Sequence, residues 1–264
     1  MRFALPFLAW FALGFVGIAV MATRIGLDAL RAVEGAPQMS DGLLRALLIV
    51  QPAVLLAVAV AVGVALSERA GLRSWLTARL RGDPLPLVSF PSIVGTLALT
   101  TALALVALLL DLAFRLLAPD AFVGLPGPDL ALIPRLSALL YGGITEELML
   151  RYGLMTGLAW AVLALMRGRA GGRSTDGRHA GAMWGVIVLV AILFGAGHLP
   201  ALSASVEPNL VLVIRTIAIN AILGTLYGWL YWRYALEHAI LAHAFTHGVF
   251  WLAGPLMASV AGLA

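Results

Sequence analysis

Seven long apolar segments follow one another along the chain, and each is long enough to cross a lipid bilayer. A transmembrane helix needs about 20 apolar residues to cross roughly 30 Å of hydrocarbon. The segments that meet this length cover, approximately, residues 3–23, 46–67, 90–112, 136–160, 183–203, 210–232 and 238–262. The sequence therefore predicts an all-α polytopic transmembrane helical bundle of about seven to eight helices.

The composition supports a membrane protein and excludes several kinds of chemistry. Hydrophobic residues make up 62% of the chain and charged residues 11%, whereas a soluble domain carries about 25% charged residues. The chain has no cysteine, which excludes disulfides, thiolate metal sites and a cysteine nucleophile. Its net charge of +4 would suit nucleic acid, but the basic residues are arginines gathered in loops between the apolar segments. We therefore expect the lipid bilayer, and no nucleic acid, as a partner.

The arginines also predict how the chain is oriented. Residues 68–83 and 167–179 each hold four arginines, whereas residues 204–209 hold none. The loop after the first segment balances its arginines with acidic residues. The basic loops alternate along the chain, as the positive-inside rule requires of cytoplasmic loops. We expect an integral protein of a bacterial inner (plasma) membrane, with a cytoplasmic N-terminus and a first segment that is retained rather than removed as a signal peptide.

One of the basic loops has a helical pattern of its own. Within residues 67–82, Leu72, Trp75, Leu76 and Leu80 recur at helical spacing, with arginines on the other side. This pattern predicts an amphipathic interfacial helix that lies against anionic lipid. No internal repeat or boundary divides the chain, so residues 1–264 are expected to form a single transmembrane domain.

The fourth segment contains GGITEELMLRYG at residues 142–153, which places three charged residues in an apolar stretch. Ionisable residues inside a membrane span are costly and are typical of functional sites. Glu147 and Arg151 lie four residues apart on one face of a helix and are expected to form an ion pair. Glu146 points about 100° away from Glu147 around the helix, so it is not expected to pair with Arg151 in the same way. The alternative is a structural cluster in which all three charges join helices together.

Histidines in two later segments add to this constellation. His198 ends the sequence FGAGH in the fifth segment, where small residues allow a neighbouring helix to come close. His243 and His247 lie one helical turn apart in the sequence HAFTH of the seventh segment. Two imidazoles at this spacing can bind one metal ion or donate hydrogen bonds to one oxygen. In the sixth segment, Arg215 is expected to pair with Asp111 rather than to line the site.

One carboxylate and three imidazoles on three spans are suited to hydrolysing an amide. Glu146 in an apolar pocket can act as general base on a water molecule, and His198 can hold that water or protonate the leaving nitrogen. His243 and His247 can stabilise the oxyanion on the scissile carbonyl. The same residues could instead hold Zn²⁺, which would activate the water directly. The residues alone leave both arrangements open.

The three motifs resemble those of the CPBP family of intramembrane proteases, the type II CAAX prenyl endopeptidase-like or Abi family. EELMLR at 146–151 matches EExxxR, and FGAGH at 194–198 matches FxxxH. HAFTH at 243–247 stands where the family commonly has HxxxN. The resemblance covers approximately residues 90–252, which we take as the motif-bearing core.

The resemblance implies a role for each motif residue. Glu146 would be the catalytic glutamate, with His198 as its partner in activating water. Glu147 and Arg151 would organise the site, and the two histidines of HAFTH would stabilise the oxyanion. Where the family commonly has Asn, this chain has His247, which can still donate a hydrogen bond and makes a zinc site more credible than usual.

We therefore predict an intramembrane endopeptidase that acts on a membrane-associated peptide or protein. A glutamate-type mechanism without a cofactor is favoured, and a zinc metalloprotease is the alternative. Two other classes stay open. A proton- or ion-coupled transporter would show inverted repeats or broken helices, which the sequence does not contain. A non-catalytic immunity or scaffold protein would bind a partner in the membrane.

Overall fold

The structure, a computed structural model, describes residues 1–26, 39–85, 89–127, 131–170 and 176–260, and it is built from helices. Seven helical segments are long and apolar enough to cross a membrane, which confirms the predicted polytopic all-α bundle. The helices are α1 (Ala4–Ala22), α3 (Asp41–Leu66), η1 (Glu68–Ala70), α4 (Trp75–Arg81), α5 (Phe90–Leu117), η2 (Pro119–Phe122), α6 (Leu132–Ser137), η3 (Ala138–Glu146), η4 (Leu148–Met155), α7 (Thr156–Ala170), α8 (Asp176–Gly197), α9 (Leu199–Ser203), α10 (Leu210–Arg233) and α11 (Leu236–Val260).

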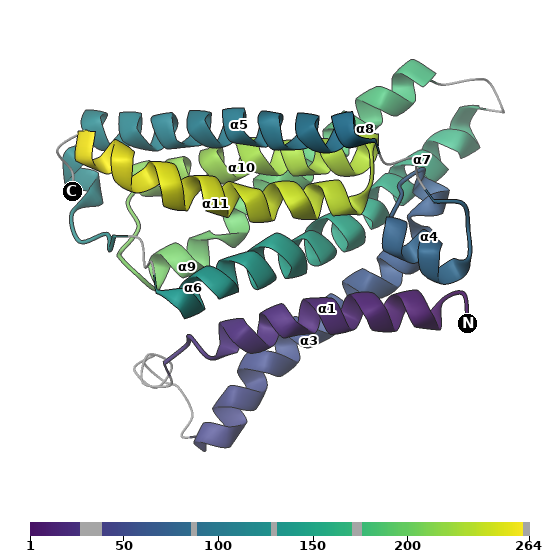
Figure 1. Cartoon of the computed structure of the whole chain (residues 1–264), viewed down its shortest axis with the longest axis horizontal. Coiled ribbons are helices and arrows are strands. Elements are labelled where there is room, and N and C mark those ends of the chain that lie inside the picture. The colour runs from purple at the N-terminus through teal and green to yellow at the C-terminus, as the bar shows by residue number, and fades with distance from the viewer. Residues whose placement is uncertain (27–38, 86–88, 128–130, 171–175, 261–264) are drawn as a thin grey trace.

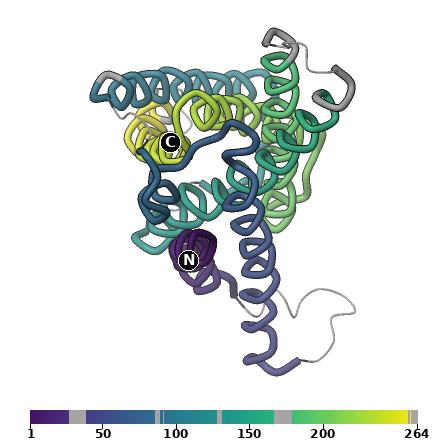
Figure 2. Tube along the Cα trace, turned by 90° about the vertical axis from the view of Figure 1, so that its right-hand side faces the viewer, coloured from purple at the N-terminus to yellow at the C-terminus, as the bar shows by residue number. Residues whose placement is uncertain are grey.

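The fourth span runs through the middle of the molecule. It comprises α6, η3, η4 and α7 in succession and extends over Leu132–Met166. Figure 1 shows α1 and α3 on one side of this span and α5, α10 and α11 on the other. The end-on view in Figure 2 shows the same separation. Because other helices cover it on both sides, the fourth span can keep charged side chains away from lipid.

The two ends of the bundle differ in the segments they carry. The N-terminus, α4 and the ends of α7 and α8 that face each other lie at one end, whereas α6, α9 and the C-terminal part of α11 lie at the other (Figure 1). The described parts of the two arginine-rich loops therefore share an end with the N-terminus, as the alternating charges predict. Some of the charges used for that prediction, Asp28, Arg31, Glu34 and Arg173, lie outside the described residues.

The predicted amphipathic helix in the first basic loop is present as α4, and part of it packs on protein. Leu72, just before α4, is fully buried in the core, and Thr77 is also buried. The indole Nε1 of Trp10 donates a hydrogen bond of 3.0 Å to the Thr77 hydroxyl. A carboxylate oxygen of Glu237 accepts hydrogen bonds from the Ser74 hydroxyl at 3.0 Å and from the Leu76 amide at 2.9 Å. The loop is thus tied to the start of α11 by hydrogen bonds, whereas its predicted contact with anionic lipid stays a prediction.

The middle of the fourth span is π-helical, with η3 and η4 as its two π-helical segments. Two side-chain hydrogen bonds follow the i−5 register of such a helix, from Thr145 to the carbonyl of Leu140 and from Thr156 to the carbonyl of Arg151, each 3.2 Å long. Turns of this kind are rare and frequently mark functional sites. No feature of the sequence predicts these turns, because the apolar pattern of the fourth segment indicates a helix without distinguishing π-helical from α-helical turns.

Glycine allows η3 to come close to α11. A Cβ added to Gly143 would lie 2.9 Å from the Cβ of Ala244, closer than such atoms approach in proteins, and 3.1 Å from its Cα. On the neighbouring span, a Cβ added to Gly195 would lie 2.7 Å from the carbonyl oxygen of Ile217 in α10. The expected close approach at FGAGH is therefore confirmed. The first contact joins two motif-bearing spans, the fourth and the seventh, and the second packs the span that carries FGAGH against α10.

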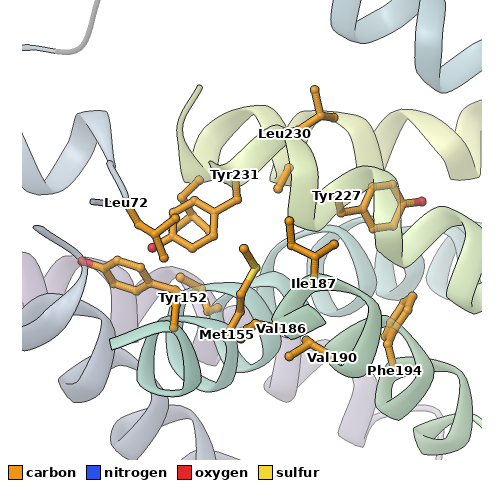
Figure 3. Close-up of a cluster of buried hydrophobic side chains, with 14 of the residues drawn as sticks. Leu72, Tyr152, Met155, Val186, Ile187, Val190, Phe194, Tyr227, Leu230 and Tyr231 are labelled. Atoms are coloured by element: carbon orange, nitrogen blue, oxygen red, sulfur yellow. The ribbon is translucent and has the colours of Figure 1, made fainter. Parts of the chain in front are cut away.

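A buried apolar cluster supports the site from one side. It joins side chains of α4, the fourth span, α8 and α10, among them Met155, Ile187 and Leu230, which are at most 1% exposed. Figure 3 shows Tyr152 and Tyr231 toward one end of this cluster and Phe194 and Tyr227 toward the other. The second pair of aromatic rings forms a wall of the candidate site, so the core and the site share residues.

Candidate active site

A fully buried ion pair forms the base of the candidate site. Arg151 donates a hydrogen bond of 3.0 Å from Nη1 to Oε1 of Glu147, and both side chains are 0% exposed. Its Nη2 donates to the carbonyl oxygen of Gly224 in α10, also at 3.0 Å. The ion pair predicted from the i,i+4 spacing is confirmed. Removing one partner of such a pair lowers the free energy of unfolding by about 3–5 kcal/mol, because the other charge is left buried without a counter-ion.

The same carboxylate holds a histidine from another span, which the sequence did not predict. Oε1 of Glu147 lies 2.8 Å from Nδ1 of His243 in α11. A carboxylate that is paired with arginine can only accept hydrogen bonds, so Nδ1 is the donor. In the neutral imidazole, Nε2 then carries the lone pair. Glu147 thereby fixes both the ring orientation and the tautomer of His243.

Glu146 has a different environment from its neighbour, as expected. Its side chain is 21% exposed, whereas that of Glu147 is fully buried. Oε2 of Glu146 lies 4.0 Å from Nε2 of His243. Of the two carboxylates, Glu146 is therefore the one that water and a substrate can reach. It lies next to His243 Nε2, the nitrogen that keeps its lone pair because Glu147 holds the proton on Nδ1.

His198 follows the last residue of α8 and takes part in a separate contact. Its Nδ1 lies 2.8 Å from the carbonyl oxygen of Phe194, so Nδ1 is again the donor and Nε2 again has the lone pair. Within the described residues, no hydrogen bond or ion pair joins His198 to Glu146, His243 or His247. The structure thus places His198 beside the cluster rather than in contact with its carboxylates.

The Phe194 ring connects His198 with the rest of the site. It stands edge-on to the imidazole of His198 at 4.7 Å and to that of His243 at 5.6 Å, measured between ring centroids. The guanidinium carbon of Arg151 lies 4.6 Å from the centre of the same ring. Phe194, the first residue of FGAGH, therefore packs against His198, His243 and Arg151. Its ring keeps water from the side of these residues that it covers.

His247 lies one turn beyond His243, as predicted. The two imidazoles are stacked, with centroids 5.2 Å apart and planes inclined by 24°. Nε2 of His247 is buried and has no hydrogen-bond partner among the described residues. A Cβ added to Gly142 would lie only 2.8 Å from that nitrogen, so this glycine makes room for the ring. An unpaired buried nitrogen next to the Glu146–His243 pair is suited to bind a group of the substrate.

Tyr227 of α10 belongs to the site although no motif pointed to it. Its ring is stacked on His243 at 4.6 Å with an interplanar angle of 16°, and its hydroxyl donates a 2.8 Å hydrogen bond to Thr246. The guanidinium carbon of Arg151 lies 5.3 Å from the ring centre. A tyrosine in an apolar span carries no catalytic signature, so only the packing of α10 against α11 shows its place.

Arg215 lies outside this cluster. Its guanidinium forms a 2.5 Å ion pair with Asp111, which also pairs with Arg115 at 2.9 Å. The expected pairing of Arg215 with Asp111 is confirmed, and this group stabilises the packing of α5 against α10.

The donor atoms of the site fit zinc in type but not in arrangement. Imidazoles whose Nδ1 is held by a carboxylate or a carbonyl are typical zinc ligands, and His243 and His198 are both held in this way. A catalytic zinc ion, however, takes three protein ligands. Among the residues that the structure describes, no group of three or more His, Asp or Glu side chains is arranged to hold a metal ion. We therefore derive no catalytic step through a metal.

Comparison with known proteins agrees with the motifs. A family model described as type II CAAX prenyl endopeptidase Rce1-like matches residues 128–249, which include all six motif residues described above. Searches of curated proteins and of solved structures return no match. Over residues 128–249, the chain is therefore similar to the type II, Rce1-like kind of CAAX prenyl endopeptidase.

Proposed function

We propose that the protein is an intramembrane endopeptidase that hydrolyses a peptide bond of a membrane-associated peptide or protein. The observation that carries this proposal is the facing pair of Glu146 Oε2 and His243 Nε2, 4.0 Å apart inside the membrane-spanning bundle. Both atoms are proton acceptors, and they are close enough to contact the same water molecule. The family match independently supports proteolysis.

In the first step, Glu146 acts as general base. It removes a proton from the water while the water oxygen attacks the scissile carbonyl carbon, and the carbonyl π electrons move onto the oxygen as an oxyanion. Nε2 of His243 accepts a hydrogen bond from the same water and so orients it. Positioned general bases of this kind contribute about 10²–10⁴-fold to a rate.

In the second step, the carbon–nitrogen bond breaks and the oxyanion returns to a carbonyl. The amine leaves with a proton from Glu146, which restores the carboxylate. His247 is the group best placed to donate a hydrogen bond to the oxyanion, because its Nε2 has no other partner. His198 contacts the cluster through the Phe194 ring, which keeps water from the apolar side of the site. This assignment makes the enzyme a glutamate-type rather than a metal-dependent peptidase.

The proposal is tested by replacing Glu146 with Gln in purified protein and measuring cleavage of a quenched fluorescent peptide library. The wild type should cleave members of the library, and the variant should lose about 10²–10⁴-fold in rate. Glu207→Gln, a change of the same kind at an exposed residue between α9 and α10, is the matched control and should retain full activity. Retained cleavage by Glu146→Gln would remove Glu146 from the mechanism.

A second measurement separates a protease from a transporter. Wild-type protein in liposomes is tested for proton-coupled flux alongside peptide cleavage. Cleavage without flux supports the endopeptidase. Flux that disappears in Glu146→Gln, with no peptide cleaved by the wild type, would assign the same carboxylate to transport instead.

A further inference from the structure

A groove between α5, α8 and α10 opens on the side of the bundle. It has a volume of about 420 Å³, and its lining includes Leu99, Leu103, Trp184, Ile222, Leu226 and Trp229. Two of these residues, Leu99 and Trp184, are 37% and 41% exposed, so the groove is open rather than enclosed. All three helices belong to segments that are long and apolar enough to cross a membrane, so this lateral groove faces the bilayer.

The lateral groove lies on the opposite face of α10 from the candidate active site. Tyr227 of α10 stacks on His243, with ring centroids 4.6 Å apart. Trp229 lines the groove two residues later, and two residues turn a helix by about 200°. A molecule in the lateral groove therefore does not occupy the place of a substrate at Glu146.

The lining of the lateral groove suits an apolar ligand. Its side chains are aliphatic or tryptophan, except for Thr225. The Thr225 hydroxyl donates a hydrogen bond of 2.7 Å to the carbonyl oxygen of Ala221 in its own helix, so it needs no partner from a ligand. Inside the bilayer, the hydrocarbon around the protein consists of lipid acyl chains. The lateral groove is therefore suited to hold an acyl chain.

An arginine stands at one end of the lateral groove. Ile222, Leu226, Trp229 and Arg233 are spaced four, three and four residues apart, so they lie along one face of α10. Arg233 ends the helix and is exposed, and within the described part of the chain its guanidinium has no ion pair or hydrogen bond. It lies at the end of the bundle that holds α4, because the following helix, α11, is tied to α4 through Glu237.

The length of the lateral groove matches one leaflet of a bilayer. Eleven residues separate Ile222 from Arg233, which corresponds to about 16 Å at a rise of 1.5 Å per residue. One leaflet contributes about half of the roughly 30 Å of hydrocarbon. Trp184 and Trp232, whose rings meet edge-on with centroids 6.0 Å apart, lie near the same end as Arg233. Tryptophans are typical of the membrane–water interface, so Arg233 lies at the level of the lipid headgroups.

We propose that the lateral groove and Arg233 bind one phospholipid with a net negative headgroup. An acyl chain fills the groove, and the phosphate accepts hydrogen bonds from the Arg233 guanidinium. A phospholipid is the component of a bilayer that carries an anion at one end of a chain of leaflet length. The bound lipid supports α10 from the face opposite Tyr227. This lipid site does not depend on the proposed peptidase function.

The test measures lipid binding by native mass spectrometry of delipidated protein in detergent. The protein is titrated with phosphatidylglycerol, which is anionic, or with phosphatidylcholine, which has no net charge. Arg233→Gln removes the cation, and Leu103→Trp fills the groove. The matched controls are Arg79→Gln, at an exposed arginine of α4, and Leu105→Trp, at a residue of α5 that is 40% exposed and lies outside the groove.

The wild type should bind one phosphatidylglycerol with a Kd on the order of tenfold below that for phosphatidylcholine, as expected for a charge-assisted contact. Arg233→Gln should bind the two lipids equally, and Leu103→Trp should bind both on the order of tenfold more weakly. Both controls should bind as the wild type does. Phosphatidylglycerol should also raise the melting temperature of the wild type more than that of Arg233→Gln or Leu103→Trp, because the lipid stabilises the folded state that binds it.

Leu103→Trp is compared with its own melting temperature in detergent alone, which separates loss of binding from loss of the fold. Leu103→Phe fills less of the groove and should bind lipid with an intermediate Kd. The Glu146→Gln variant should bind lipid as the wild type does. Its result keeps the lipid site separate from the peptidase function, because lipid binding that survives in a protein without cleavage supports the site while the peptidase proposal fails.

Four results would overturn the lipid site. Equal lipid binding by Leu103→Trp and Leu105→Trp would place the lipid outside the groove. An unchanged headgroup preference in Arg233→Gln would remove Arg233 as the partner of the phosphate. Competition by glycerol phosphate as strong as that by the lipid would leave an anion site without an acyl chain. A dimer that forms on delipidation and is insensitive to added lipid would make the groove an interface between two copies of the chain.

Discussion

Glu147 on the fourth span and His243 on the seventh are joined by a hydrogen bond of 2.8 Å between Oε1 and Nδ1. The same oxygen accepts a hydrogen bond from Arg151, so one buried atom organises two helices. Because a carboxylate only accepts, the proton of the neutral imidazole stays on Nδ1. Nε2 is left as an acceptor that faces Glu146. The second glutamate of the motif thus determines which chemistry the histidine can perform.

Replacing Glu147 with Gln should lower cleavage on the order of a hundredfold, because the amide no longer fixes the His243 tautomer. The free energy of unfolding should also fall, by about 3–5 kcal/mol, because Arg151 is left unpaired in the interior. Cleavage of the best library peptide and thermal unfolding in detergent measure the two effects.

The two effects can be separated by the conservative change. Glu147→Asp keeps the charge for Arg151 and should recover much of the stability, while the shorter side chain leaves His243 less well held. In nitrogen NMR spectra of histidine-labelled protein, His243 should be protonated at Nδ1 in the wild type, and that signal should be lost in Glu147→Gln. An unchanged His243 spectrum in Glu147→Gln would contradict the positioning role.

The adjacent glycines of the fourth span should respond differently to alanine. In Gly142→Ala the new methyl would lie 2.8 Å from Nε2 of His247, a side chain that can rotate, so activity should fall while the fold survives. In Gly143→Ala it would meet the Cβ and the backbone of Ala244, so the helices must separate and stability should fall.

Gly248→Ala is the control for both changes, because a Cβ there meets nothing within 4 Å. Cleavage rates and melting temperatures of the three variants check the prediction. Equal loss of stability in Gly142→Ala and Gly143→Ala would show that His247 is not the group that responds to the first change.

Three features could be predicted from the sequence. The number of spans follows from the lengths of the apolar segments, and the Glu147–Arg151 pair follows from its i,i+4 spacing. The Asp111–Arg215 pair follows from matching opposite charges in neighbouring spans. The hydrogen bond from His243 to Glu147 could not be predicted, since it depends on how closely the fourth and seventh spans approach. The Gly142–Gly143 pair was the available signal for that approach. Tyr227 had no signal, because an aromatic residue in an apolar span is ordinary in sequence.

The orientation of the bundle can be tested with single cysteines, and the chain has no native cysteine to interfere. Leu85, 52% exposed, follows α4 at the end that holds the N-terminus, and the exposed Ser205 follows α9 at the other end. In intact bacterial cells, a membrane-impermeant maleimide should label Ser205→Cys at once and Leu85→Cys only after permeabilisation. The opposite pattern would place the N-terminus outside.

Zinc content distinguishes the favoured mechanism from its main alternative. Glu146 and His243 provide two ligand atoms 4.0 Å apart, but the described residues hold no third ligand within reach of the same point. Elemental analysis of protein purified without a histidine tag should therefore find much less than one zinc per chain, and chelators should leave cleavage unchanged. His243→Ala and His247→Ala are analysed in parallel. Stoichiometric zinc that is lost in both variants, together with chelator-sensitive cleavage, would make the enzyme a metalloprotease and would require His198 to move toward Glu146.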